Sequence, residues 1–285
     1  MILGCLGSSF FHPQSMGFVN YFAGKNCSNQ MGIFVSLGSL GFAFGPLIAA
    51  LITQTTGLES IIYTSILGLT LAIVMFKFVP KLSKLEKAPE KKEFFKSFKE
   101  IFSNKQMNYL IIISMMKSLV TNSSCILLPF LWKSMNYSPF YIGFALFLFV
   151  FAGSLGSLAS PKLERIVGSK QIICVSLSLT FPLMLLFALT YKTMPVVSLL
   201  IFTIIGFTTM LAQPVTLVLA QKTLPKYKSV VAGLINGFCW GIVALCLSAL
   251  GLIAEKFGII NVLITLSFFP ISSCFLMKNI RLDFE

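Results

Sequence analysis

Two ionisable side chains lie inside long apolar segments of the sequence, where charged groups are rare. His12 is the only histidine and stands beside Pro13, and Lys117 lies near the middle of another apolar segment. Histidine exchanges a proton near neutral pH and a buried ammonium attracts anions, so both are candidates for a substrate or proton pathway. The alternatives are a neutral His12 that bonds a carbonyl freed by Pro13, and a Lys117 that pairs with a polar group or carboxylate of the protein.

Four other polar or aromatic side chains in apolar segments are weaker candidates for the same pathway. They are Asn122, Gln213, Asn236 and Trp240. Ordinary hydrogen bonding or packing between helices would explain each of them equally well.

Catalytic chemistry and a bound metal are not expected. The seven cysteines are scattered without a Cys-x-x-Cys pair, and one histidine cannot build the usual zinc site. We find no phosphate-binding loop, no nucleophile elbow and no cluster of His, Asp and Glu in an apolar segment. The sequence therefore predicts neither an enzyme nor a cofactor.

The elements that carry these residues are predicted to be membrane-spanning helices. Hydrophobic residues make up 56% of the chain and charged residues 11%, against about 25% charged in soluble domains. A helix of about 20 apolar residues crosses the hydrocarbon core, and only helices satisfy their own backbone there. Nine such segments are predicted, at 1–23, 30–53, 60–80, 107–131, 139–160, 170–191, 195–219, 229–254 and 259–278.

The formal net charge of +13 follows the connections between these segments. Lysine and arginine gather in alternate loops, most densely in 81–105, and are sparse in the others. This is the positive-inside pattern of a multi-pass protein, with the C-terminus predicted in the cytoplasm. The expected partner of this charge is the lipid bilayer, and a nucleic-acid partner is not expected because no aromatic and basic stripe leaves the membrane segments.

An internal repeat indicates the fold. At an offset of 201 residues four residues recur in matching places: Pro13 and Pro214, Lys25 and Lys226, Gly32 and Gly233, Gly57 and Gly258. Parallel repeats of this kind relate the two six-helix halves of major facilitators. The interpretation is an incomplete major facilitator fold with nine of twelve helices. Residues 1–80 would be helices 4–6, 81–105 a cytoplasmic central loop and 106–285 helices 7–12, with on the order of 100 residues expected upstream of Met1.

The central loop contains an amphipathic stretch. In 93–104 the apolar residues recur at helical spacing, with lysine and glutamate opposite. The pattern predicts a helix in the cytoplasmic membrane interface, and docking of a regulatory partner is the alternative.

The first two segments resemble one branch of a known family. The stretch 4–13, which ends in Phe10-Phe11-His12-Pro13, together with 32–34 and Gly41-Phe42-Ala43-Phe44-Gly45-Pro46-Leu47, resembles the fosmidomycin-resistance branch of the major facilitator superfamily. The resemblance implies an efflux pump of the bacterial inner membrane that exports a small antimicrobial or metabolite by proton antiport. Gln14 departs from it, because the branch commonly has glutamate there and glutamine cannot exchange a proton. A titrating group would then be His12 or lie outside this sequence.

Two further motifs are similar to those of major facilitators. Gly38, Gly41 and Gly45 place backbone on one helix face and Pro46 bends the helix, as in the antiporter motif of drug exporters; simple close packing is the alternative. The loop 163–170 resembles the cytoplasmic acid–Arg–x–Gly–basic motif, displaced by one residue, although a positive-inside turn would also explain it. Its residues are Glu164, Arg165, Gly168 and Lys170.

Three functional hypotheses follow. The first is a secondary transporter that exports a small drug or metabolite by alternating access, with protons as one coupling ion that the resemblance implies. The second is an importer of a nutrient or an anion with the same fold. The third is a non-transporting fragment of a split or misannotated gene, in which case a separate polypeptide could supply helices 1–3.

Overall fold

The structure, a computed structural model, describes residues 2–79 and 91–280, and every regular element in them is helical. The α-helices are α1 (Ile2–Ala23), α2 (Cys27–Thr55), α3 (Thr64–Phe78), α4 (Lys91–Ser103), α5 (Lys105–Ser134), α6 (Pro139–Val167), α7 (Ser169–Ser178), α8 (Thr180–Thr190), α9 (Pro195–Thr223), α10 (Lys228–Ala232), α11 (Cys239–Phe257), α12 (Ile259–Phe268) and α13 (Ser273–Lys278). The short helical turns are η1 (Gly24–Asn26), η2 (Leu58–Tyr63), η3 (Pro225–Tyr227), η5 (Phe269–Ser272) and the π-helix η4 (Gly233–Phe238).

The all-α membrane class is confirmed, with one difference from the nine expected spans. Eight helical segments of the described chain are long and apolar enough to cross a membrane. The ninth, α1, is 22 residues long but is not among the eight. It contains the polar residues His12, Gln14 and Ser15, which lower the hydropathy of the segment.

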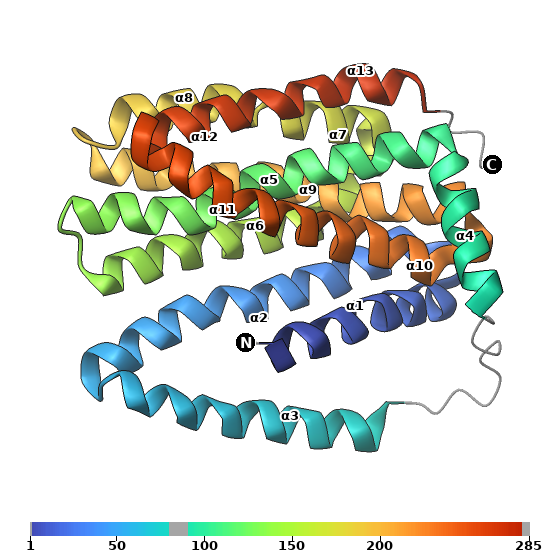
Figure 1. Ribbon diagram of the computed structural model, residues 1–285, viewed down its shortest axis with the longest axis horizontal. Helices are drawn as coiled ribbons and strands as arrows, with labels where there is room; N and C mark the ends of the chain where they lie inside the picture. Colours follow the sequence, from blue (N-terminus) through green and yellow to red (C-terminus); the bar gives the residue numbers. More distant parts are fainter. Residues whose placement is uncertain (1, 80–90, 281–285) are drawn as a thin grey trace.

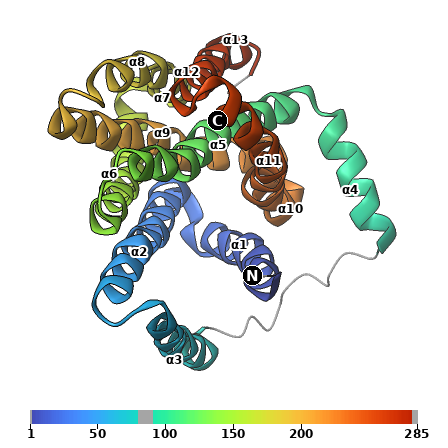
Figure 2. The same cartoon turned by 60° about the vertical axis from the view of Figure 1, so that its left-hand side comes forward.

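The helices lie side by side in an elongated bundle, and α4 crosses one end of it (Figure 1). We call this end the basic end, because the lysine-bearing turns 162–170 and 222–228 lie there. The opposite end, formed by the connections 56–63, 135–138 and 191–194, is called the far end. Figure 2 shows α1, α2 and α3 on one side of the bundle, with α5–α9 and α11–α13 on the other.

The two sides meet along a close seam between α2 and α6. Ser36 and Ser154 each donate to the other's backbone carbonyl at 2.9 Å. Nearer the basic end, a Cβ on Gly32 would lie 2.7 Å from Pro161 Cγ. Small side chains therefore let the two backbones approach, and the serines satisfy polar groups between them.

The second close seam joins α6 to α9, again through small residues. A Cβ on Gly153 would lie 3.2 Å from the carbonyl oxygen of Gly206. Pro214 has no N–H, so the carbonyl of Met210 one turn earlier loses its helical donor. The hydroxyl of Ser157 on α6 donates to that carbonyl at 3.2 Å. The proline thus creates an acceptor that the neighbouring helix uses.

The amphipathic helix of the central loop is α4, at 91–103 against the expected 93–104. Ile101 is fully buried within the apolar cluster at the basic end. The hydroxyl of Tyr227 donates to Glu100 Oε2 at 2.6 Å, and Asn104 caps α5 by accepting from the Met107 N–H at 3.1 Å. This helix is therefore anchored on the bundle as well as amphipathic. Residues 80–90 of the expected loop lie outside the described residues, and the division into halves stays a prediction.

By contrast, α3 lies apart from the bundle in both views (Figures 1 and 2). None of its residues is buried, although the span Leu58–Phe78 is long and apolar enough to cross a membrane. Such a helix is compatible with lipid contact on most of its surface.

Candidate functional site

A chain of hydrogen bonds between three helices lies in the middle of the bundle. Lys117 Nζ on α5 donates to Gln213 Oε1 on α9 at 2.5 Å, and Gln213 Nε2 donates to Asn236 Oδ1 on η4 at 3.2 Å. Asn236 Nδ2 lies 3.3 Å from Met16 Sδ on α1 and 3.3 Å from the carbonyl oxygen of Ala232. Three of the residues singled out in the sequence therefore belong to one site.

The lysine determines which side chain donates and which accepts in each of these hydrogen bonds. An ammonium group only donates, so Gln213 must turn its carbonyl oxygen toward Lys117 and its amide nitrogen away. Asn236 must then accept through its oxygen, and its own amide nitrogen is left facing Met16. All three side chains donate in the same direction, from α5 toward α1.

Local backbone features position the two amides. Gln213 precedes Pro214 in α9, where the helical ladder is interrupted. Asn236 lies in a π-helix, whose extra residue per turn shifts side chains relative to a regular helix; such segments are frequent at functional sites. Neither feature is needed for a simple membrane-spanning helix.

Met16 of α1 is the last residue in this series of hydrogen bonds, and it was not expected from the sequence. Its side chain is 4% exposed and packs in the apolar cluster at the basic end. A methionine in an apolar segment carries no sign of a polar contact, because the thioether is a weak acceptor and packs as an apolar group elsewhere.

Lys117 is buried without a counter-ion in the described part of the chain. It is 6% exposed. The acidic residues of residues 2–79 and 91–280 all lie near the ends of helices, at Glu59, Glu93, Glu100, Glu164 and Glu255. A buried cation is costly unless it is paired, so this position favours an anion beside the ammonium.

The other pathway candidates lie outside the hydrogen-bonded chain. His12 is exposed on α1, four residues before Met16 and thus on the same helix face one turn away. Its ring meets Phe11 edge-on at 5.9 Å. Gln14 and Trp240 are exposed, and Asn122 is partly exposed on α5. For Pro13 the structure describes the helical backbone only.

The glycine face of α2 does not form the seam with α6. A Cβ on Gly38, Gly41 or Gly45 would meet no atom of the described chain within 4 Å. The seam runs instead along the neighbouring face, through small residues that were not predicted to form a packing face: Gly32, Ser36, Ala43 and Ala50. The face that resembles the antiporter motif is open.

Comparison with known proteins decides the family. The model of the Major Facilitator Superfamily matches residues 1–249. The chain belongs to this superfamily.

Two curated relatives match almost the whole chain. The fosmidomycin resistance protein of Escherichia coli (strain K12) is 28% identical over 277 residues, which are 93% of this chain and 66% of that protein. The uncharacterized MFS-type transporter YfnC of Bacillus subtilis (strain 168) is 25% identical over 276 residues, again 93% and 66%. The chain thus spans just under two thirds of the length of these relatives.

In the loop that resembles a motif of this superfamily, Glu164 makes hydrogen bonds and Gly168 ends a helix. Glu164 accepts from Ser28 Oγ of α2 at 2.5 Å and from Ser169 Oγ of α7 at 2.7 Å. Gly168 ends α6 with φ of 88°, a conformation that favours glycine. Arg165 is exposed and Lys170 partly exposed. At this loop, the two sides of this major facilitator are therefore joined by the carboxylate of Glu164 and the hydroxyl of Ser28.

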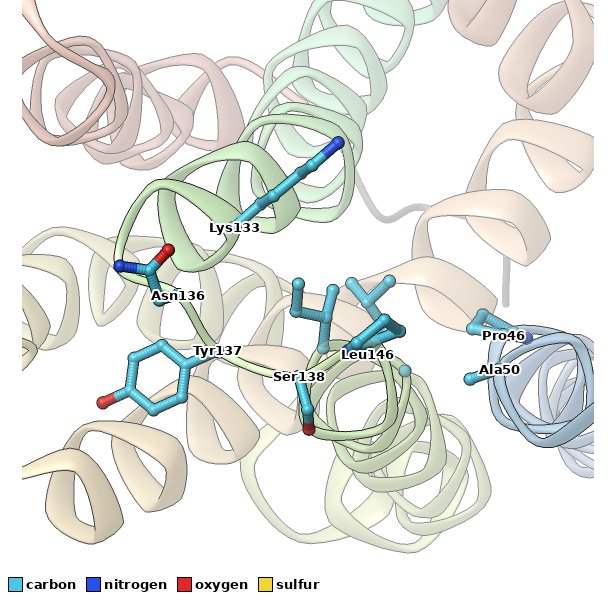
Figure 3. Close-up of a pocket in the computed structure, with 10 residues that line it drawn as sticks. Pro46, Ala50, Lys133, Asn136, Tyr137, Ser138 and Leu146 are labelled. Carbon is cyan, nitrogen blue, oxygen red and sulfur yellow. The ribbon is translucent and has the colours of Figure 1, made fainter. Parts of the chain in front are cut away.

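At the far end, a hollow opens between α2 and the α5–α6 turn. Figure 3 shows Pro46 and Ala50 on one side of it, with Leu146 and the turn residues on the other. Its volume is about 700 Å³, and Lys133 is the one charged residue that lines it. Lys133 is 16 residues beyond Lys117 in α5, about 24 Å along the helix. In this superfamily member the hollow is therefore separate from the hydrogen-bonded series that begins at Lys117.

Proposed function

We propose that the chain forms the substrate pathway of a secondary transporter that exports a small drug or metabolite by alternating access. The observation that carries the proposal is the chain of hydrogen bonds from Lys117 through Gln213 and Asn236 to Met16. It joins α5, α9 and η4 to α1, across the boundary between the two sides of the bundle. In major facilitators the substrate binds near the membrane midplane between two repeats that rock against each other.

Contacts at the basic end support an arrangement in which this end is closed. Glu164 joins α2 to α6 through Ser28, and Gly17 of α1 packs directly on Ser229 of α10. We propose that the basic end faces the cytoplasm of a bacterial inner membrane, because its lysines follow the positive-inside pattern. Rocking of α1 and α2 against the other side would then open this end.

Export as the direction rests on the relative that is named a fosmidomycin resistance protein. Coupling to protons would rest on His12, since it is the one histidine of the sequence and lies one turn from Met16. An importer with the same site remains the rival hypothesis.

We propose further that another helix covers the open glycine face of α2, supplied by a further segment or by a separate polypeptide. The 201-residue repeat supports this. It pairs Gly38 with Cys239, which is fully buried and donates to the carbonyl of Ile111 on α5 at 3.6 Å. The face of α11 that α5 covers therefore corresponds to the face of α2 that lies open.

Drug accumulation in cells tests the proposal. The chain would be expressed alone and together with the part of the Escherichia coli relative that it leaves unmatched. We expect lower cellular fosmidomycin and higher resistance with both polypeptides, loss of both effects in Lys117→Ala, and retention in the exposed control Lys133→Ala. Higher uptake would support the importer, and no transport in any combination would support a non-transporting fragment.

A further inference from the structure

The polar chain around Lys117 contains a cation whose charge nothing in the described residues neutralises. Its single hydrogen-bond partner there is the neutral carbonyl of Gln213, although an ammonium has three N–H groups to donate. In a low-dielectric interior the attraction between this ammonium and an anion is much stronger than in water. An uncharged ligand would leave the cost of burying the charge unchanged.

We propose that Lys117 binds the anionic group of the substrate, a carboxylate or a phosphate, and that binding reverses the direction of the hydrogen bonds through Gln213 and Asn236. This inference rests on the proposed transport function and names the substrate class of the same site. The second part follows from the donors and acceptors of the two amides.

An anion beside Lys117 accepts from the N–H groups of the ammonium that Gln213 does not use, and its other lone pairs attract a further donor from Gln213. If Gln213 turns its amide by half a rotation, its nitrogen also faces the anion and its oxygen faces Asn236. Asn236 must then turn as well, so that its nitrogen donates to Gln213. Asn236 Oδ1 then faces Met16 Sδ in place of the amide N–H, and no hydrogen bond can form because a thioether has no proton to donate.

The reversal connects the substrate to the boundary between the two sides of the bundle. Asn236 Nδ2 loses Met16 of α1 together with the carbonyl of Ala232, its two present acceptors. Occupation of Lys117 therefore weakens the attachment of α1 to η4. A transporter needs such a link, because its ligand can shift the equilibrium only by interacting differently with the two states.

Methionine-methyl NMR of the purified chain in lipid nanodiscs measures both parts. The probes are benzoate and inorganic phosphate, with benzamide as the uncharged control, and Met16→Leu assigns the Met16 signal. We expect the anions to shift this signal with dissociation constants on the order of 1–10 mM. Lys117→Gln should weaken this binding at least tenfold, while Lys117→Arg and the exposed Lys133→Gln retain it.

The outcomes separate the parts of the inference. Equal shifts with benzamide, unchanged anion binding in Lys117→Gln, or no shift with either anion up to about 100 mM would overturn the anion site. If anion binding shifts the signal of 15N-labelled Lys117 Nζ but not the methyl signal of Met16, the proposed reversal of the Gln213 and Asn236 amides is wrong. Thermal unfolding of each variant shows whether it is folded. Because the assay measures binding without transport, its failure is distinct from a failure of drug export.

Discussion

The hydroxyl of Ser28 donates a 2.5 Å hydrogen bond to Glu164, and this bond ties α2 to the end of α6. The same carboxylate accepts from Ser169, which begins α7 on its own side of the bundle. One carboxylate thus makes one bond across the boundary between the sides and one within its own side. Only the first can hold the basic end closed.

Removal of this bond should expose the basic end. We expect Ser28→Ala to speed maleimide modification of the adjacent Cys27 about fivefold, because losing a hydrogen bond worth about 1 kcal/mol changes an opening equilibrium by that factor. Ser169→Ala is the matched control and should leave the rate near that of the unsubstituted chain. Peptide mapping by mass spectrometry resolves Cys27 from the other cysteines. Equal rates in the two variants would show that the Ser28 bond does not hold this end.

The two glycine faces of α2 should respond differently to the same substitution. In Gly32→Ala the new methyl group would meet Pro161 Cγ at 2.7 Å and the Ser157 carbonyl at 3.2 Å, so we expect a loss of about 1–3 kcal/mol. In Gly38→Ala the new methyl group meets no atom of the described residues within 4 Å, so the change should be neutral or stabilising by up to about 1 kcal/mol, because alanine favours the helix. Unfolding of the purified chain measures both. A further helix on the open face would make Gly38→Ala costly only when that helix is present.

The Met210 carbonyl, which has no helical donor because of Pro214, can be tested in a double-mutant cycle of Ser157 and Pro214. Ser157→Ala leaves the buried Met210 carbonyl without its donor and should cost about 1–3 kcal/mol. Pro214→Ala restores a backbone N–H to that carbonyl, so Ser157→Ala should cost clearly less in the Pro214→Ala background. Chemical unfolding of the four proteins gives the coupling energy. A value near zero would mean that Ser157 does not compensate for the proline.

Composition and repeat were sufficient to predict the helical membrane fold, because spans of apolar residues have few other solutions in lipid. The meeting of Lys117, Gln213 and Asn236 was not predictable in the same way. Each stood out as polar in an apolar segment, but their contact depends on helix rotation and on the π-helix η4, which the hydrophobic pattern does not encode.

The packing face of α2 shows where pattern reasoning fails. Gly38, Gly41 and Gly45 form the more regular small-residue stripe, yet Ser36 and its neighbours meet α6. A stripe predicts that some helix approaches, and it does not say which one. Met16 is the opposite case, since an apolar side chain gave no sign that it ends a polar chain.

The docking of α4 on the bundle gives a last prediction. Ile101 is fully buried in the cluster at the basic end, so Ile101→Ala should lower the free energy of unfolding by about 2–4 kcal/mol. Ile166, which is 70% exposed at the end of α6, is the control, and Ile166→Ala should change it by less than about 0.5 kcal/mol. If α4 were held only by the membrane interface, the two substitutions would have similar small effects in detergent. Tyr227→Phe adds a second check, because it removes the bond to Glu100 while leaving the apolar contacts of Ile101 in place.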